Sequence, residues 1–304
     1  MRNYKFILSL FVVLLGTQAT WAAVDHFVTV TGQVGEHSWI TTTEVVNSNS
    51  SFGIGGGVGV HYELQQKHFL FTAGADINPS YSIFSLRPYQ TSFDDVDTEN
   101  DAMTYTYYFD ERKDAYTNLA VHVPVLVGGQ FDKFYFLVGA KVSLSMFGRS
   151  SATAVVRSEG AYKQFIGTFR DMDEHAYFSD YLAANKAPLS FNFNVLASAE
   201  IGLRLGDGYK ATGFGYKEKR KIQYRIALFA DYGVLNAVAT GSNQLYITPQ
   251  RFNEEDMSSG IILNDLLLSE ARPNSVNPLQ VGVKFTVLFK VGEPKKCVIC
   301  RYDD

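Results

Sequence analysis

Cysteine is nearly absent from this 304-residue chain, which has only Cys297 and Cys300, both among the last eight residues. Small secreted domains that depend on disulfides spread their cysteines through the core, so the sequence excludes that class. The spacing matches half of a zinc site, but zinc needs four ligands and the chain has no second pair. We therefore expect a local or an intermolecular disulfide in a C-terminal tail, and no metal site there.

Long apolar segments are also lacking after the first 22 residues. The mean hydropathy is −0.06, and a bundle of membrane helices would need apolar stretches of about 20 residues. Charged residues make up only 19% of the chain, and its formal net charge is −4. No long basic run is present, so the sequence does not indicate a nucleic-acid partner.

Residues 1–22 have the pattern of a secretory signal peptide. Arg2 and Lys5 give a positive start, Phe6–Leu15 form a short apolar core, and small residues occupy the cleavage site. A single membrane anchor is the alternative interpretation, but the apolar core is too short for one. We expect the mature chain to begin near Ala23, outside the cytoplasm.

The clearest strand pattern lies between Asn118 and Met146. Every second residue is apolar from Leu119 to Val127 and again from Phe134 to Met146, and a period of two is typical of a strand. The short turn between the two runs contains Gly129, so the pattern predicts a hairpin. Each run is about the 9–11 residues that a tilted strand needs to cross a bilayer, although a soluble sandwich would show the same alternation.

The same alternation recurs along the chain and predicts about eight strands in total. The further strands are Val28–Val34, Phe52–Leu64, Phe69–Asn78, Phe191–Leu205, Ile222–Tyr232 and Leu279–Val291. Phe52–Leu64 carries glycine at every second position from Gly53 to Gly59. A row of glycine on one face of a strand suits the tight curvature of a small barrel.

The predicted connections alternate between long polar segments and shorter ones. The long ones are residues 35–51, 79–116, 148–188 and 235–277. In 79–116 the alternation of Tyr105, Tyr107 and Phe109 is consistent with an extension of the flanking strands, and in 235–277 a short helix is expected at Ile261–Glu270. If the mature N-terminus lies in the periplasm, every long connection lies outside the cell, which is typical of bacterial outer-membrane barrels. We therefore predict an all-β, antiparallel transmembrane β-barrel of about eight strands over residues 23–291, with long extracellular loops and a periplasmic tail at residues 292–304.

Two runs in the central hairpin resemble a known family. Leu119–Val127 has the sequence LAVHVPVLV, and after a short turn Phe134–Val142 reads FYFLVGAKV. This arrangement resembles the PorT-like family of small bacterial outer-membrane β-barrels. The resemblance implies an eight-stranded barrel behind a signal peptide, and an outer-membrane location. The long connections and the tail after the last strand depart from the family pattern, and no functional residues match position by position.

The polar faces of the predicted strands carry charges of both signs. An eight-stranded barrel has an interior only wide enough for side chains, so these charges are expected to pair and to fill the lumen; a selective proton or ion path is the alternative. The residues of this expected lumen charge network are His61, Glu63, Asp76, Lys141, Glu200, Arg204, Arg225, Asp231, Lys284 and Lys290.

The sequence does not predict catalysis. His37 and Ser38 are adjacent, so in a strand they point to opposite faces and cannot form a nucleophile–base pair. His175 follows an acidic run that fits either a metal-binding patch or a solvated loop. We expect no enzymatic role and no cofactor.

The expected function follows from the expected loops, because long loops in compact proteins usually carry function. We expect a surface-exposed binding or structural barrel that contacts outer-membrane lipid and an extracellular or periplasmic protein or glycan. A narrow channel is one alternative. A periplasm-facing accessory of a secretion or envelope-assembly machine, with residues 206–221 and the tail as contacts, is another, and a soluble lipocalin-like barrel is the rival fold.

Overall fold

The computed structural model describes most of the chain between Val24 and Gly292. The described ranges are residues 24–42, 48–96, 101–164, 167–170, 180–206, 209–211, 217–238, 247–253, 258–269 and 275–292. The expected signal peptide, the cysteine pair of the tail and His175 lie outside them. No helix among these residues has the length and apolar composition that a membrane crossing requires.

Eight antiparallel strands are hydrogen-bonded side by side in a closed ring. In order around the ring, which is also chain order, they are β1 (Asp25–Thr42), β2 (Ser48–Gln66), β3 (Phe69–Leu86), β5 (Ala102–Phe131), β6 (Phe134–Tyr162), β9 (Asn194–Leu205), β12 (Ile222–Gly233) and β15 (Ser275–Val291). The last strand pairs with the first, from His26 opposite Val291 to Thr42 opposite Ser275. This confirms the prediction of an all-β fold with about eight antiparallel strands.

The strands continue well past their predicted ends. The prediction of a polar loop is wrong over most of residues 148–188, and in 79–116 the alternative of extended flanking strands is correct. The strands β5 and β6 remain paired from Phe131 opposite Phe134 up to Met103 opposite Tyr162. Three shorter strands join them: β4 (Tyr89–Val96) pairs with β5, while β7 (Thr168–Arg170) and β8 (Tyr181–Pro188) pair with β6.

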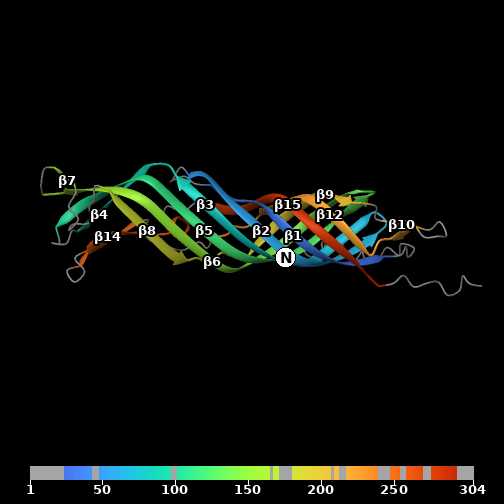
Figure 1. Ribbon diagram of the computed structural model, residues 1–304. Coiled ribbons are helices and arrows are strands. Elements are labelled where there is room, and N and C mark those ends of the chain that lie inside the picture. Colours follow the sequence, from blue (N-terminus) through green and yellow to red (C-terminus); the bar gives the residue numbers. More distant parts are fainter. Residues whose placement is uncertain are drawn as a thin grey trace, which may run out of the picture.

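The remaining four strands form two hairpins that are separate from the large sheet. The β13 (Ile247–Asn253) and β14 (Ser258–Leu263) hairpin contacts β8, and the small hairpin of β10 (Tyr209–Ala211) and β11 (Lys217–Lys219) follows β9. Figure 1 shows an elongated molecule with β10 near one end and β4, β7 and β14 at the other. We call the latter end, formed by β4, β7, β8, β13, β14 and residues 102–117 and 148–162, the extension.

The extension has an apolar core, which explains why its strands form. Tyr105, Tyr107 and Phe109 alternate along β5 and are at most 3% exposed, so the aromatic alternation belongs to a strand with a buried face. The other members of the core are Leu86, Met103, Ala152, Ala154, Val156, Ala183, Ile247, Ile261, Leu263 and Leu266. The extension is therefore a packed structure and not a set of solvated loops.

The helix expected at Ile261–Glu270 is wrong. Residues up to Leu263 belong to β14, and Leu266–Leu268 form a single 3₁₀ turn, η2, in which the Leu267 N–H donates to the Asp265 carboxylate. Short apolar runs do not distinguish a buried strand from a helix by periodicity. The Asn264–Ser269 segment, which we call the strap, lies inside the extension, where Leu266 and Leu267 are buried.

Polar contacts to β5 hold the strap in place. Arg112 pairs with Asp114 at 2.7 Å and also donates to the Asn264 carbonyl oxygen at 2.6 Å. The Tyr116 hydroxyl donates to Asp265 Oδ1 at 3.0 Å. Burial raises the pKa of Asp265 and holds the pKa of Tyr116 well above its usual value, so the phenol stays protonated as a donor.

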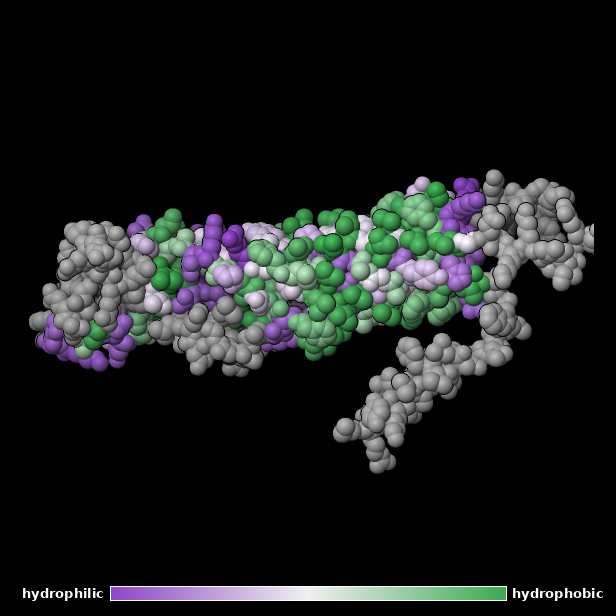
Figure 2. Space-filling model, turned by 90° about the horizontal axis from the view of Figure 1, so that it is seen from below, coloured by the Kyte–Doolittle hydropathy of each residue, from purple (hydrophilic) through white to green (hydrophobic). Residues whose placement is uncertain are grey.

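The wall of the ring has apolar side chains outside and mostly polar ones inside, where a small apolar cluster is also buried: Leu70, Leu126, Tyr135, Leu137 and Ala227. Along β12 every second side chain is buried, and these inward residues include Gln223, Arg225 and Asp231, whereas Ile226 and Leu228 are exposed. Figure 2 shows the apolar side chains gathered over the part of the molecule toward the β10 end. This distribution is the reverse of that in a water-soluble protein, where the apolar face of a sheet is the buried one.

Glycine allows three neighbouring strands to approach closely near the middle of β1. Gly35 pairs with Gly282 of β15 on one side and with Gly55 of β2 on the other. A Cβ atom at Gly35 would lie 2.2 Å from the Val281 carbonyl oxygen, whereas one at Gly32 would have nothing within 4 Å. The backbone therefore requires glycine at position 35 but not at position 32.

Gly35→Ala should destabilise the ring, while Gly32→Ala on the same strand should not. Overpacking against backbone costs about 1–3 kcal/mol, whereas a substitution into open space changes stability by no more than about 0.5 kcal/mol. Denaturant unfolding followed by circular dichroism measures both variants. Equal unfolding midpoints for the two would contradict this assignment of the close approach.

Candidate functional site

Three ion pairs cross the interior of the ring between strands that are not neighbours. Arg225 of β12 meets Glu63 of β2, with Nη1 and Oε2 2.8 Å apart. The other two pairs are Lys141 Nζ with Asp231 Oδ2 at 2.7 Å and Lys284 Nζ with Glu200 Oε2 at 2.8 Å. These contacts link strands that are two or three places apart in the ring.

Arg225 links two of the three pairs, its own with Glu63 and that of Lys284 with Glu200, into a network. It donates to Gln130 Oε1 at 2.7 Å, and its guanidinium lies 4.5 Å from the centre of the Tyr135 ring. The Tyr135 hydroxyl donates to Glu200 Oε1 at 2.6 Å, which brings in Lys284 as well. Charge-assisted hydrogen bonds of this kind are stronger than neutral ones, so the network is a rigid filling of the lumen.

The remaining members of the expected network are placed differently. His61 Nε2 lies 2.8 Å from Asp76 Oδ1 on the neighbouring strand, and both side chains are buried. Arg204 is also inward and buried. Lys290 pairs with Asp25 at 2.9 Å near the ends of β15 and β1, and both side chains of this pair are partly exposed. Nine of the ten residues thus lie buried inside the ring, and Lys290 lies at its rim.

Glycine makes room for the His61–Asp76 pair. A Cβ atom at Gly59 would lie 1.8 Å from Asp76 Oδ1, and one at Gly74 would lie 2.3 Å from His61 Cδ2. The inward glycines of β2 and β3 therefore provide the volume that the buried pair occupies. The sequence pattern indicated curvature at these positions, but not this packing role.

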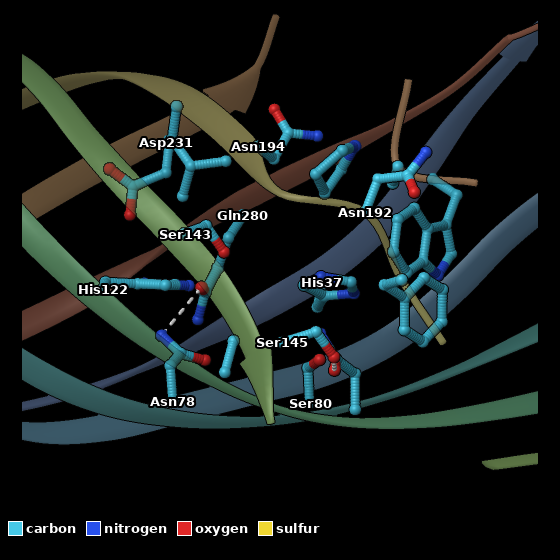
Figure 3. A pocket seen from close by; sticks show the side chains of 17 residues that line it. His37, Asn78, Ser80, His122, Ser143, Ser145, Asn192, Asn194, Asp231 and Gln280 are labelled. Carbon is cyan, nitrogen blue, oxygen red and sulfur yellow. Dashed lines mark hydrogen bonds between the residues drawn. The ribbon is translucent and has the colours of Figure 1, made fainter. Parts of the chain in front are cut away.

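A polar cavity lies between the ion pairs and the extension. Its volume is about 40 Å³, and a water molecule needs about 10–15 Å³ of such volume, so it has room for about three waters. Figure 3 shows side chains from opposite sides of the ring converging on it, with the Asn78 amide bonded to Gln280. The labelled polar lining residues are His37, Asn78, Ser80, His122, Ser143, Ser145, Asn192, Asn194, Asp231 and Gln280.

An apolar layer closes the cavity toward the extension. Trp39 stacks on Phe191 with ring centres 5.3 Å apart, and both line the cavity. Behind them lies a buried cluster of Phe84, Tyr116, Leu189, Ala237, Val238, Leu267 and Val276. Along the described part of the interior, charged groups, a small polar cavity and an apolar layer therefore follow one another.

The sequence did not reveal a contact between His37 and Ser82. His37 Nδ1 lies 2.8 Å from Ser82 Oγ, and both side chains are buried. Ser38, which is adjacent to His37 in the sequence, instead donates its hydroxyl to Glu36 Oε1 on the outside. Ser82 and His37 are brought together by the packing of β1, β2 and β3, which sequence spacing does not specify. Among the described residues no carboxylate is hydrogen-bonded to His37 to orient it as a base.

The described residues contain no group of three or more His, Cys, Asp or Glu side chains arranged to hold a metal ion. No protein-family model matches the chain, and no curated protein matches it either.

Removing one partner of the Lys141–Asp231 pair should destabilise the ring more than removing both. Lys141→Met or Asp231→Asn leaves an uncompensated buried charge and should cost about 3–5 kcal/mol. The double variant should cost less than either single change, because neither charge is left unpaired. Denaturant unfolding measures all three proteins.

The exposed Arg157–Asp110 pair of the extension, at 3.0 Å, provides a matched control. Arg157→Met should change the unfolding free energy far less than Lys141→Met, because solvent screens exposed pairs. Additive effects of Lys141→Met and Asp231→Asn would show that the pair is not coupled.

Proposed function

We propose that this chain is an integral bacterial outer-membrane β-barrel that is closed to ions and acts through its extension. The observation that carries the proposal is the distribution of side chains on the ring, with charged residues inside and apolar residues outside. In lipid every backbone polar group needs a partner within the protein, and a ring whose last strand pairs with its first leaves no strand edge open.

Exposed aromatic residues support a membrane band of the expected height. Tyr224 and Tyr232 lie eight residues apart on β12, which is roughly 26 Å of strand at about 3.3 Å per residue and roughly 20 Å of height at a strand tilt of about 40°. The apolar band of outer-membrane barrels is about 25 Å tall, with aromatic girdles at both edges. Further exposed aromatic residues near the β10 end are Tyr62, Phe69, Phe131, Phe134 and Phe289, and those near the extension are Tyr81, Phe147 and Phe193.

The short and long connections between strands lie at opposite ends of the ring, as expected for an outer-membrane barrel. The tight turns after β2 and β5 lie at the same end of the ring as Asp25 and Val291, whereas the extension lies at the opposite end. In the proposed orientation the turns and the strand ends at Asp25 and Val291 face the periplasm. The extension projects from the cell surface, where it meets an extracellular protein or glycan as a binding or structural element without a catalytic role.

Leu228→Arg should impair insertion into lipid. Leu228 is 61% exposed on the outer face of β12, and arginine on the lipid face costs about 2–4 kcal/mol near the bilayer midplane. Leu182→Arg is the matched control, because Leu182 is 73% exposed but lies on β8 of the extension. Folding into lipid vesicles, followed by heat-dependent mobility on SDS gels, measures both. If both substitutions were tolerated equally, the proposed lipid face would be wrong.

The refolded protein should give no conductance steps in a planar lipid bilayer. The crossing ion pairs, the small cavity and the apolar layer fill the described interior. A heat-dependent mobility shift establishes that the sample is folded. Reproducible steps that change in size with Arg225→Ala would contradict a closed lumen and favour a narrow channel.

A further inference from the structure

The wall of the ring is interrupted on one side of β6. Toward β9 the pairing ends at Ser143 opposite Asn194, and toward β8 it begins with the Leu189 N–H donating to the Gly148 carbonyl oxygen. No described residue pairs with Leu144–Phe147 on this side. The residues of the facing segment pair with a different part of the chain. Phe191 forms a β-bridge with Val238, and the Asn192 N–H donates to the Ala237 carbonyl oxygen.

The outer rim of this interruption is apolar. On the β5 side the register shifts so that Met146 is an extra residue in β6, and a bulge of this kind bends a strand and redirects its side chains. The rim residues are all at least 42% exposed: Leu144, Met146, Phe147, Phe193, Val234 and Leu235. They adjoin the apolar outer face and not the polar surface of the extension.

The polar cavity lies directly behind the interruption. Ser143 and Ser145 line it from β6, and Asn192 and Asn194 line it from the facing segment. Ser143 and Ser145 are only half-buried and Asn192 is exposed, although all three border an otherwise buried interior. The partial exposure of these lining residues places the cavity next to the outer surface here.

Three buried polar atoms of the lining have no hydrogen-bond partner among the described residues. They are His122 Nδ1, Asp231 Oδ1 and Gln280 Nε2, on side chains at most 6% exposed. Buried polar groups are normally satisfied, and each one left without a partner calls for an explanation. A ligand that both donates and accepts hydrogen bonds would satisfy all three.

The charges around the cavity select a neutral ligand. A cation would meet the Lys141 ammonium that already neutralises Asp231, and an anion would meet the Asp231 carboxylate. Hydroxyl groups both donate and accept, so they suit the mixed set of an amide N–H, an imidazole nitrogen and a carboxylate oxygen. The volume, which equals about three waters, admits a head about the size of glycerol.

We propose that Leu144–Phe147 borders a lateral entrance through which the cavity takes the neutral, hydroxyl-bearing head of a single-chain amphiphile, such as a monoacylglycerol. The acyl chain would lie outside, along the apolar rim. This inference rests on the proposed membrane embedding of the ring.

Trp39 reports directly on the cavity. The chain has two tryptophans, so Trp21→Phe in the full chain leaves Trp39, which lines the cavity, as the only one. Monoacylglycerol is titrated into the folded protein in micelles of an alkyl amine oxide, whose head carries no hydroxyl group. We expect a saturable change in the emission of Trp39.

Gln280→Leu should raise the half-saturating concentration of monoacylglycerol at least tenfold, because it removes the amide donor from the cavity. Gln33→Leu on the neighbouring strand is the matched control, since Gln33 is equally inward and buried but does not line the cavity. Ser143→Val is a second variant. It removes a hydroxyl group at the entrance and should also weaken binding. Each variant is first shown to be folded by its heat-dependent mobility.

An unchanged emission in the folded protein would overturn the proposal, as would equal responses of Gln280→Leu and Gln33→Leu. The same response to free glycerol would show a soluble polyol site and not a lateral one. The same response to a fatty acid or an alkylamine would overturn the selection of a neutral head. These failures leave the membrane proposal intact, because the Leu228→Arg comparison tests that separately.

Discussion

The pairing of β15 with β1 is the contact on which the rest of the structure depends. It closes the ring, so every one of the eight strands has a neighbour on both sides through most of its length. Closure also separates an inside from an outside, and the period-two alternation of each strand then assigns every side chain to one of them. The polar interior and the apolar outer face are consequences of that single closure combined with the alternation.

A narrow closed interior brings charged side chains together. Glu63 and Arg225 are far apart in the chain and lie on strands that do not touch, yet they meet across the lumen at 2.8 Å. Such pairs satisfy one another where water is excluded, and the inward glycines supply the space they need. The cavity beside the interruption in β6 combines three unsatisfied polar atoms with enclosed volume, and that combination makes it a candidate ligand site.

The extension is built differently from the ring. Its interior is aromatic and aliphatic, and the buried strap crosses it, held by Arg112, Asp114 and Tyr116. This part resembles the core of a water-soluble domain, joined to the ring by the uninterrupted hairpin of β5 and β6. In the proposed orientation the same two strands therefore lie in lipid at one end and in water at the other, and they change the polarity of their inner face between Ala120 and Tyr116.

The sequence alone determined the strand class, the number of strands in the ring and which faces carry the charges, because a period of two is a local property that survives folding. Nine of the ten charged residues expected inside are buried there for that reason. The partners of those charges, the Ser82–His37 contact, the strap in place of a helix and the cavity were decided only by the tertiary structure. Each depends on the register between strands and on which sides of the ring face one another, and these are set by the closure of the whole ring and by no single stretch of sequence.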